Sequence, residues 1–445
     1  MLIKNGRVWL KNLTCIDSMR VLHITAHLGG GVGRVLSRVV AETSQQHQAI
    51  QHTIAILEKP ENLQYVKHAD EYGAKILICP DRDELACQID CADVVQLEWW
   101  HHPALAKLLG NDWLPAMRLI VWSHISGLYP PVIPPAFVKL AHRFLFSSPC
   151  SWENPSLSLL DQETKQKVYV VFSSGGFADM PFLKRYFSHF TRTGYVGTLN
   201  FAKLNPDILD YVDAVDIPGF CLSLVGGADM ASQLIAESKR RGISDKINFK
   251  GYSANVAEEL AKFDIFAYLL NPQHYGTSEN ALLEAMAMGV VPVVLDNPAE
   301  RYLVRHGETG LIVDSPKKFA DTIRLLAENP SERRRLSENA SRYVRHRFSI
   351  KETVKHLTAH YQSVMRLKKK VLDFRRVFGE TPADWFLACQ GHEAWRFTED
   401  NSNWVTNNLP YFICEKTKSS IFHYREYFPN DSRINIWAER LDSTQ

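Results

Sequence analysis

Short runs of β-branched and other apolar residues alternate with helical stretches along most of the chain, in two successive series. Strands that alternate with helices predict a parallel, doubly wound α/β sheet. Between the first two runs, Val35, Leu36, Val39 and Val40 recur at helical spacing, which predicts an opening βαβ unit. Ligands of open α/β sheets bind beyond the carboxyl ends of the strands, so two facing sheets would enclose a central cleft. We therefore expect an α/β fold of two Rossmann-like lobes.

The boundaries of the parts follow from these runs. The first series is expected to form strands at 21–24, 53–57, 75–79, 94–97, 119–122, 144–146 and 168–172. The second is expected to form strands at 195–197, 220–225, 247–249, 265–268, 291–295 and 311–313. We divide the chain into a lead-in (1–18), a first lobe (19–185), a second lobe (190–350), a long helix (351–378) and an aromatic-rich extension (379–445). The extension is too apolar for disorder, so we expect it to pack onto a lobe.

Composition excludes several classes of function. The formal net charge is +2, so no large field attracts nucleic acid. The eight cysteines are scattered without a CxxC pair, which predicts reduced thiols and no metal site. The first residues lack the apolar core of a signal peptide, and no apolar run reaches the roughly 20 residues that span a bilayer. We expect a cytoplasmic protein with no cofactor and no bound metal.

The segment 275–289, YGTSENALLEAMAMG, is the most informative motif. Thr277 and Ser278 are typical N-caps and predict a helix that begins near Glu279. The first backbone N–H groups of such a helix bind phosphate or sugar oxygens well. The helix is apolar on nearly all sides, so Glu279 and Glu284 need buried partners, for which sugar or ribose hydroxyls are suitable. Alternatively, Glu279 only stabilises the helix dipole and Glu284 pairs with a neighbouring base.

Two further segments follow expected strands with glycine-bearing turns. In the second lobe a strand runs into Gly197 and the chain then reaches Lys203, which can bind a diphosphate in the cleft or remain a solvated surface charge. In the first lobe the turn 27–34, HLGGGVGR, lets a ligand approach the backbone closely. This turn does not fit GxGxxG, but Glu58 follows the second strand, which leaves a dinucleotide-binding dehydrogenase open.

Aromatic and histidine side chains follow the fourth expected strand. The run Trp99, Trp100, His101 and His102 can form an aromatic rim for a sugar or a lipid-linked acceptor. It can equally be packing, and the sequence does not separate the two.

Residues 19–348 resemble the large retaining family four of glycosyltransferases, which has the GT-B architecture. The resemblance rests on the Gly-rich turn, the segment from Gly197 to Lys203, the acidic helix, and shorter motifs at 224–227, 249–251 and 306–313. It implies transfer of a sugar from a nucleotide-sugar donor, UDP- or GDP-linked, to a glycan or lipid-linked acceptor. It also implies that the transfer retains the configuration of the sugar and uses no metal.

The resemblance implies roles for individual residues. Lys203 would bind the donor diphosphate, Glu284 the donor ribose, and the turn 275–279 the sugar and phosphate. His124 looks like the histidine near the reacting sugar, although a lone histidine is often a satisfied core residue. The catalytic residues expected are His124, Lys203 and Glu279. The donor-binding residues expected are Gly30, Gly31, Gly197, Thr198, Lys203, Tyr275, Gly276, Thr277, Ser278, Glu279, Asn280 and Glu284. The acceptor-binding residues expected are His27, Arg34, Trp99 and His101.

Two positions depart from the family pattern. The family usually has an arginine where this chain has Thr198, and a glutamate eight positions before Glu284, where this chain has Gly276. Glu279 is the candidate to replace that glutamate. The departures leave open a catalytically degenerate protein that binds a nucleotide sugar without turning it over.

Two other patterns carry alternatives. Asp81-Arg-Asp83 after the third strand has the form of a DxD site, which would grip a magnesium diphosphate in a metal-dependent transfer. The run 366–378 is basic and amphipathic, which predicts either peripheral contact with the anionic inner face of a membrane or a solvated helix face.

Overall fold

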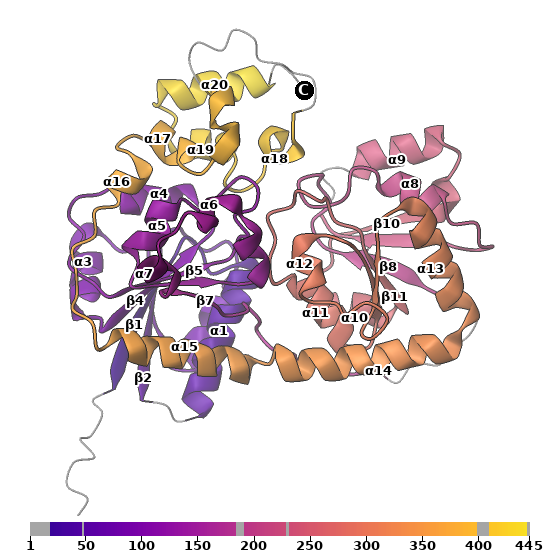
Figure 1. The fold of residues 1–445 in the computed structure, drawn as a ribbon, viewed down its shortest axis with the longest axis horizontal. Coiled ribbons are helices and arrows are strands. Elements are labelled where there is room, and N and C mark those ends of the chain that lie inside the picture. The colour runs from indigo at the N-terminus through magenta and orange to yellow at the C-terminus, as the bar shows by residue number, and fades with distance from the viewer. Residues whose placement is uncertain (1–17, 47–48, 184–190, 228–230, 398–408, 443–445) are drawn as a thin grey trace, which may run out of the picture.

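The computed structural model describes residues 18–46, 49–183, 191–227, 231–397 and 409–442. The chain folds into two α/β lobes that lie side by side, with a helical extension over the first (Figure 1). The lead-in 1–18 lies outside the described residues apart from residue 18, as do residues 398–408 and 443–445 of the extension.

The first lobe contains a 7-stranded parallel sheet in the order β3-β2-β1-β4-β5-β6-β7. Each strand falls where its apolar run predicted one. The strands are β1 (Met19–Thr25), β2 (Ile50–Ile56), β3 (Lys75–Ile78), β4 (Val94–Trp99), β5 (Leu119–Ser123), β6 (Arg143–Phe146) and β7 (Val168–Val170). The order reverses between β1 and β4, and open sheets of this kind bind ligands outside such a switch point.

The second lobe repeats this arrangement with a 6-stranded sheet in the order β10-β9-β8-β11-β12-β13. The strands are β8 (Thr193–Val196), β9 (Leu222–Val225), β10 (Ile247–Gly251), β11 (Ile265–Tyr268), β12 (Val291–Leu295) and β13 (Leu311–Val313). The corresponding switch point lies between β8 and β11. Two Rossmann-like lobes are therefore confirmed.

Helices cover both sheets because each crossover between parallel strands must bury the sheet face. Those of the first lobe are α1 (Gly30–Gln45), α2 (Gln64–Glu71), α3 (Arg82–Cys91), α4 (Pro103–Leu109), α5 (Pro135–Leu140), α6 (Pro155–Ser158) and α7 (Gln162–Lys165). Those of the second are α8 (Ile208–Asp213), α9 (Ala231–Arg240), α10 (Val256–Ala261), α11 (Asn280–Ala287), α12 (Pro298–Arg301), α13 (Pro316–Glu328) and α14 (Pro330–Arg347). Asp81 is the exposed N-cap of α3 and accepts the backbone N–H of Glu84 at 2.9 Å, which accounts for the first acid of the DxD pattern.

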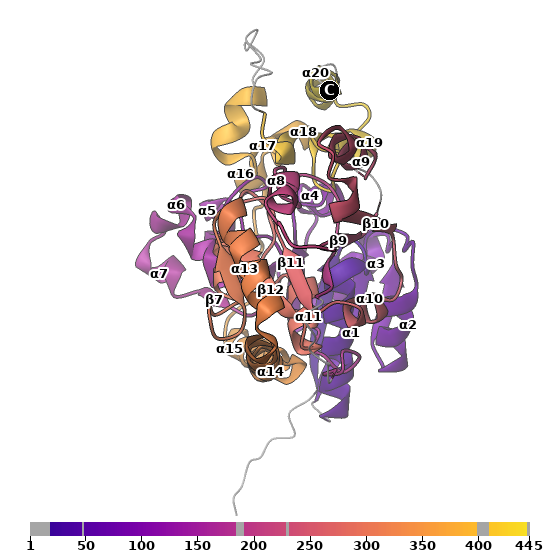
Figure 2. The same cartoon turned by 90° about the vertical axis from the view of Figure 1, so that its right-hand side faces the viewer.

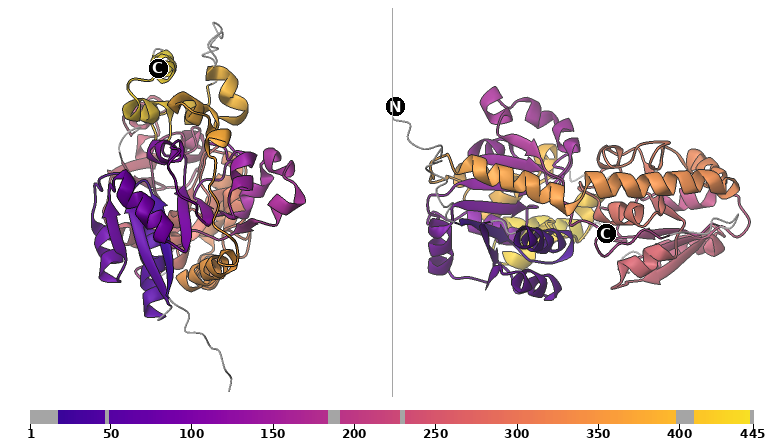
Figure 3. Two further views of the ribbon diagram at one scale, coloured as in Figure 1. Left: turned by 90° about the vertical axis from the view of Figure 1, so that its left-hand side faces the viewer. Right: turned by 90° about the horizontal axis from the view of Figure 1, so that it is seen from below.

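The chain returns from the second lobe to the first through α14 and α15 (Ile350–Val364), which run along one edge of the molecule (Figure 3). Val354, Leu357 and Tyr361 of α15 are fully buried in the core of the first lobe. The described part of the first lobe therefore includes a helix that lies far along the sequence from its sheet.

The long helix expected at 351–378 is a wrong prediction. The helix α15 ends at Val364, and the chain then runs extended until α16 (Arg375–Phe378), with Lys370 paired to Met117 in an antiparallel bridge. The cations of 366–370 would repel one another one turn apart on a helix, whereas Met117 supplies backbone hydrogen bonds to the extended chain. The basic run is thus not an amphipathic helix, and the membrane-facing stripe expected of it is absent from this part of the structure.

The extension packs onto the first lobe, as predicted (Figure 2). Its helices are α16, α17 (Pro382–Leu387), α18 (Tyr411–Cys414), α19 (Ile421–Tyr427) and α20 (Ser432–Asp442), with a 3-10 turn at Gly391–Phe397. Phe386, Tyr424 and Trp437 belong to the same hydrophobic core as the strands of the first lobe. None of the helices in the described ranges combines the length and the apolar character that a membrane span requires.

Candidate active site

A cavity of about 1010 Å³ lies where the two lobes and the extension meet. The first lobe contributes the Gly-rich turn, and the second contributes the end of β8 and the loop before α11. The extension forms the remaining wall. Residues that line the cavity include His27, Gly29, Gly30, Gly31, Trp100, His124, Thr198, Tyr275, Phe412, Lys418 and Tyr427.

The Gly-rich turn opens directly into this cavity. Gly29 is the N-cap of α1 and provides no side-chain cap, so the first N–H groups of the helix stay available to a ligand. Gly30 has a φ of 56°, which strains any residue with a Cβ. A Cβ on Gly31 would lie 3.4 Å from the side chain of Asn280 in the second lobe. The expected close approach of a ligand to this backbone is therefore possible from the central cavity.

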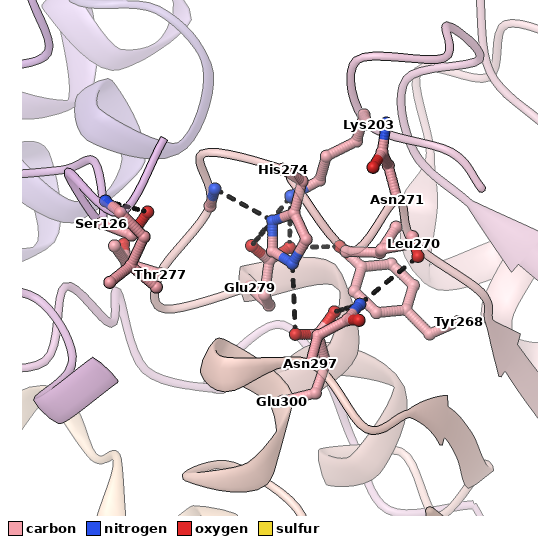
Figure 4. Close-up of polar contacts among 12 residues, drawn as sticks. Ser126, Lys203, Tyr268, Leu270, Asn271, His274, Thr277, Glu279, Asn297 and Glu300 are labelled. Carbon is pink, nitrogen blue, oxygen red and sulfur yellow. Dashed lines mark hydrogen bonds and ion pairs between the residues drawn. The ribbon is translucent and has the colours of Figure 1, made fainter. Parts of the chain in front are cut away.

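Lys203 and Glu279 form a buried ion pair in the second lobe (Figure 4). Lys203 Nζ lies 2.8 and 2.6 Å from the two carboxylate oxygens, and the Tyr268 hydroxyl donates to Glu279 Oε2 at 2.6 Å. Burial alone would raise the pKa of Glu279, but the charge of Lys203 holds it below its usual value. Lys203 is not among the residues that line the cavity. Its ammonium is thus neutralised by the protein instead of facing the cavity.

The carboxylate of Glu279 lies where a side chain at position 276 would be. A Cβ built on Gly276 would lie 1.7 Å from Glu279 Oε1 and 2.6 Å from Lys203 Nζ. Glu279 itself has a φ of 36°, a left-handed conformation that brings its side chain back toward the preceding loop. The geometry accounts for the departure at Gly276, because one carboxylate replaces the other next to Lys203.

His274 holds this loop in place (Figure 4). Its Nδ1 accepts the backbone N–H of Gly276 at 3.0 Å, so Nε2 is the nitrogen that donates toward Glu300 Oε2, 3.2 Å away. Asn297 donates to Glu300 Oε1 at 3.4 Å. The loop before α11 is therefore fixed by buried polar groups from α12.

Thr277 and Ser278 do not cap α11, and this expectation was wrong. The N-cap is Glu279, with no side-chain hydrogen bond to the helix. Ser278 Oγ instead accepts the N–H of Ser173 at 2.9 Å and donates to the Ser147 carbonyl at 3.0 Å, both in the first lobe. The Ser278 hydroxyl thus forms hydrogen bonds that join the two lobes, which are in direct contact at this point.

Glu284 also reaches across to the first lobe. It pairs with Arg34, whose other guanidinium nitrogen lies 2.9 Å from Asp179. The predicted alternative, a neighbouring base as the partner of Glu284, is the arrangement in the structure. Arg34 is only 11% exposed and holds two carboxylates, so in this arrangement it is not presented to an acceptor. Ribose binding by Glu284 stays a prediction.

Trp99 and His101 are wrong predictions as acceptor-binding residues, because both are fully buried. The Trp99 ring packs 4.8 Å from that of Phe137, and His101 Nε2 lies 2.9 Å from the Tyr424 hydroxyl. The neighbour Trp100 lines the cavity instead. Alternate side chains at a strand end point to opposite faces, and the extension covers the face that Trp99 and His101 occupy.

His124 lines the cavity but both of its ring nitrogens have partners. Nε2 lies 2.7 Å from Glu98 and Nδ1 lies 3.1 Å from the Ser173 hydroxyl. Burial alone would raise the pKa of Glu98, but hydrogen bonds from His124 and His23 hold it below its usual value. Glu98 was not among the residues expected at the site, although an acid inside an apolar strand is a visible signal in the sequence. The face of the His124 ring is available for contact with a ligand, whereas its two nitrogens are hydrogen-bonded to Glu98 and Ser173.

Glu58, His102 and His423 place one candidate ligand atom each within 4.8 Å of one another, a set of groups that divalent metals bind. However, His102 Nδ1 accepts the N–H of Ala104 at 3.2 Å, and His423 Nδ1 accepts that of Ser419 at 3.0 Å. Burial lowers the pKa of His102 to about 2 and that of His423 to about 4, so both rings are neutral and carry the proton on Nε2. Ligation of a metal through Nε2 would require this proton to leave and the ring to give up its Nδ1 hydrogen bond. In the present arrangement the cluster is a polar contact between the first lobe and α19.

The second lobe is similar to known proteins. Residues 191–343 match the family model described as glycosyl transferases group 1. The lipopolysaccharide core biosynthesis glycosyltransferase LpsE of Rhizobium meliloti is 28% identical over 174 residues, which cover 35% of this chain and 50% of that protein. The N-acetyl-alpha-D-glucosaminyl L-malate synthase of Bacillus anthracis is 29% identical over 147 residues, covering 33% and 38%. Each match thus spans half or less of the relative's own length.

Among solved structures, Anabaena HepE in complex with UDP and glucose superposes with a TM-score of 0.61 at 15% identity, covering 78% of this chain and 100% of that chain. The sucrose-phosphate synthase of Thermosynechococcus elongatus gives a TM-score of 0.59 at 14% identity, covering 79% and 100%. Both superpositions include the two lobes. At identities of 15% and 14% they show that the fold is similar.

Proposed function

Residues 191–343 form a group 1 glycosyltransferase domain within a two-lobed GT-B fold, and on this premise we propose that the chain transfers a sugar from a nucleotide-sugar donor to a glycan or lipid-linked acceptor. The observation that carries the proposal is the central cavity, which brings the Gly-rich turn of α1, His124 and Tyr275 to one space. The HepE structure holds UDP and glucose, and LpsE acts in lipopolysaccharide core biosynthesis, which supports a UDP-linked donor and a glycan acceptor.

The proposed reaction breaks the bond between the sugar and the diphosphate and forms a bond from the same carbon to the acceptor oxygen. A diphosphate oxygen takes the acceptor's proton, the configuration is retained, and no metal takes part. The free N–H groups at the start of α1 would stabilise the leaving diphosphate by about 0.3 to 2 kcal/mol. Holding two substrates in one cavity contributes up to about 7 to 11 kcal/mol, so orientation is the larger effect.

A screen of nucleotide sugars tests the proposal. Thermal unfolding is followed with UDP- and GDP-linked sugars, and release of nucleoside diphosphate is measured with those that stabilise the protein. Gly31→Leu would fill the space between α1 and Asn280 and is expected to abolish both responses. Gly227→Ala is the matched control, because a Cβ there has no heavy atom within 4 Å. If no nucleotide sugar stabilises the native protein, the proposal is wrong.

Retention and metal independence need separate measurements. The anomeric configuration of the first product formed is read by NMR, and inversion would contradict the proposed stereochemistry. Turnover is repeated after exhaustive treatment with EDTA. An activity that EDTA abolishes and magnesium restores would instead favour a metal-dependent transfer.

A second candidate is a protein that binds a nucleotide sugar without turnover. It is favoured by the ion pairs that occupy Lys203 and Glu284, two residues expected to contact the donor. The same screen separates the candidates, because this protein would show thermal stabilisation but no release of nucleoside diphosphate. A dehydrogenase would instead bind a nicotinamide nucleotide.

We also propose that the chain works in the cytoplasm, at or near the inner face of the membrane if the acceptor is lipid-linked. The described cysteines are all free thiols, which fits a reducing compartment. Fractionation of cells that express the chain, with the activity as the readout, tests the location.

A further inference from the structure

Lys418 of the extension projects into the central cavity from a fixed backbone. It lies between α18 and α19, and its neighbour Ser419 donates a hydrogen bond to the Trp100 carbonyl at 2.9 Å. Ser419 has a φ of 73°, and Ser420 caps α19. Among the described residues that line the cavity, Lys418 and Lys59 are the lysines, and no arginine lines it.

Lys418 and the backbone N–H of Gly29 compete for the one acceptor nitrogen of the neutral His27 ring. Lys418 Nζ lies 3.2 Å from His27 Nε2, while His27 Nδ1 accepts the N–H of Gly29 at 3.2 Å. Burial, together with the charge of Lys418, lowers the pKa of His27 to about 4, so the ring is neutral. If Nε2 carries the proton, it faces the ammonium; if Nδ1 carries it, it faces the N–H of Gly29. Either tautomer leaves one pair of donors opposed.

The surroundings of this pair are rich in donors. The first turn of α1 begins at Gly30 and leaves N–H groups without intrahelical partners. His102 is fully buried, and its Nε2 has no hydrogen-bond partner, although Glu58 lies 3.5 Å away. Glu58 is the acid next to Lys418, and Glu61 is the other carboxylate that lines the cavity. One oxyanion placed beside Lys418 Nζ and His27 Nε2, which lie 3.2 Å apart, would accept from both.

We propose that Lys418 and His27, with the first turn of α1, bind a phosphate group of a substrate, so that the C-terminal extension forms part of the substrate site. This inference rests on the proposed function for the source of the phosphate, which is either the donor diphosphate or a phosphate of the acceptor. Lys418 also supplies the cavity with a cation. In the wall formed by the second lobe, Thr198 stands at the position where the family usually has an arginine.

Binding of inorganic pyrophosphate to the full chain, measured by calorimetry, tests the inference. Lys418→Ala is expected to weaken binding roughly 10- to 100-fold, as expected for one lost charge-assisted hydrogen bond, and Lys418→Arg to keep most of it. Lys416→Ala is the matched control, since Lys416 lies two residues away but pairs with Asp442. Because Lys418 is exposed, its variant should fold, and its thermal midpoint verifies this.

The outcomes separate the source of the phosphate and the two proposals. If UDP or GDP displaces pyrophosphate, the site holds the donor diphosphate; if nucleotide and pyrophosphate bind together, it holds a phosphate of the acceptor. Pyrophosphate binding that depends on Lys418 would support the inference even if no nucleotide sugar turned over. The inference is overturned if pyrophosphate does not bind, or if Lys418→Ala binds it as well as the native chain or Lys416→Ala does.

Discussion

The buried charges next to the cavity show how single residues substitute for one another. Gly276 leaves room for the Glu279 carboxylate, and Glu279 adopts a left-handed conformation to reach it. A carboxylate in that place is required because Lys203 is only 14% exposed and would otherwise be buried without a partner. The glycine at position 276 and the left-handed backbone of Glu279 are thus parts of one arrangement.

We predict that Gly276→Glu destabilises the protein by about 2 to 4 kcal/mol, because it crowds a second carboxylate against the first. The double variant Gly276→Glu, Glu279→Gly should recover most of this loss. It keeps one carboxylate next to Lys203 and places glycine at the left-handed position, where a residue with a Cβ costs roughly 1 to 3 kcal/mol. Urea unfolding measures both free energies. A double variant as unstable as the single one would contradict the exchange.

A second prediction concerns the ion pair itself. Lys203→Met leaves Glu279 buried without its cation and should cost about 3 to 5 kcal/mol, whereas Lys203→Met with Glu279→Gln should cost much less. The Tyr268 hydroxyl can still donate to the amide oxygen in the double variant. A double-mutant cycle from urea unfolding measures the coupling, and additive losses would show that the pair is not coupled.

The sequence indicated which residues here are unusual, but not their partners. Acids within an apolar helix are visible in the sequence, so Glu279 and Glu284 were identified. Their partners are not visible, because Lys203 precedes Glu279 by 76 residues and Arg34 lies in the other lobe. The choice between Trp99 and Trp100 depended on which of two adjacent side chains the extension covers, and residue type carries no such information.

At the scale of elements, strands were more predictable than helix ends. A strand of a parallel sheet is buried on both faces, so it appears as a continuous apolar run such as β12, where every residue is buried. The end of α15 depends on a contact between Lys370 and Met117, which are far apart in sequence. The helix was expected to continue past Val364, because the contact between Lys370 and Met117 is not visible in the local sequence.

The histidines between α4 and α19 predict a pH-dependent attachment of the extension. The pKa values of His102 and His423 lie at about 2 and about 4, against an ordinary value of 6.5, so between about pH 6.5 and pH 4 the unfolded chain binds protons that the folded chain does not. The unfolding free energy should therefore fall with falling pH, by up to about 1.4 kcal/mol per pH unit for each histidine. Burial raises the pKa of Glu58, so the folded chain holds that carboxyl proton more tightly than the unfolded chain, which offsets part of this fall.

Urea unfolding across this pH range tests the prediction, with His423→Asn as the variant. Asparagine can still accept the N–H of Ser419, which His423 Nδ1 accepts at 3.0 Å, but it does not titrate. The unfolding free energy of the variant should fall less steeply with falling pH, by up to about 1.4 kcal/mol per pH unit, which is the contribution of one histidine. Equal slopes for variant and native chain would show that His423 does not carry the effect.

At the scale of the whole molecule, two parallel sheets in succession along the chain could be expected from the sequence, but not how the lobes meet. The lobes touch through backbone N–H groups of the first lobe: Ser126 N–H donates to the Tyr275 carbonyl and Ser173 N–H donates to the Ser278 hydroxyl, both at 2.9 Å. A backbone donor carries no residue-type signature, and a serine hydroxyl does not show in the sequence which lobe it contacts. The extension is a third part of the same site, and its aromatic content predicted packing without indicating the cavity.

The Arg34–Glu284 pair should control how often the lobes separate. Arg34→Ala leaves Glu284, which is 9% exposed, without its cation, and opening of the lobes is the cheapest way to hydrate it. Removing one partner of a buried pair costs about 3 to 5 kcal/mol, so the amides of Ser126 and Ser173 should lose roughly 100-fold or more of their protection from hydrogen exchange. Arg301→Ala is the matched control, because its pair with Glu153 also joins the lobes but is 42% and 36% exposed, and it should change exchange only a few-fold. If both variants change the exchange of these amides equally, or if Arg34→Ala leaves it unchanged, the lobes are held by their backbone contacts and not by this pair.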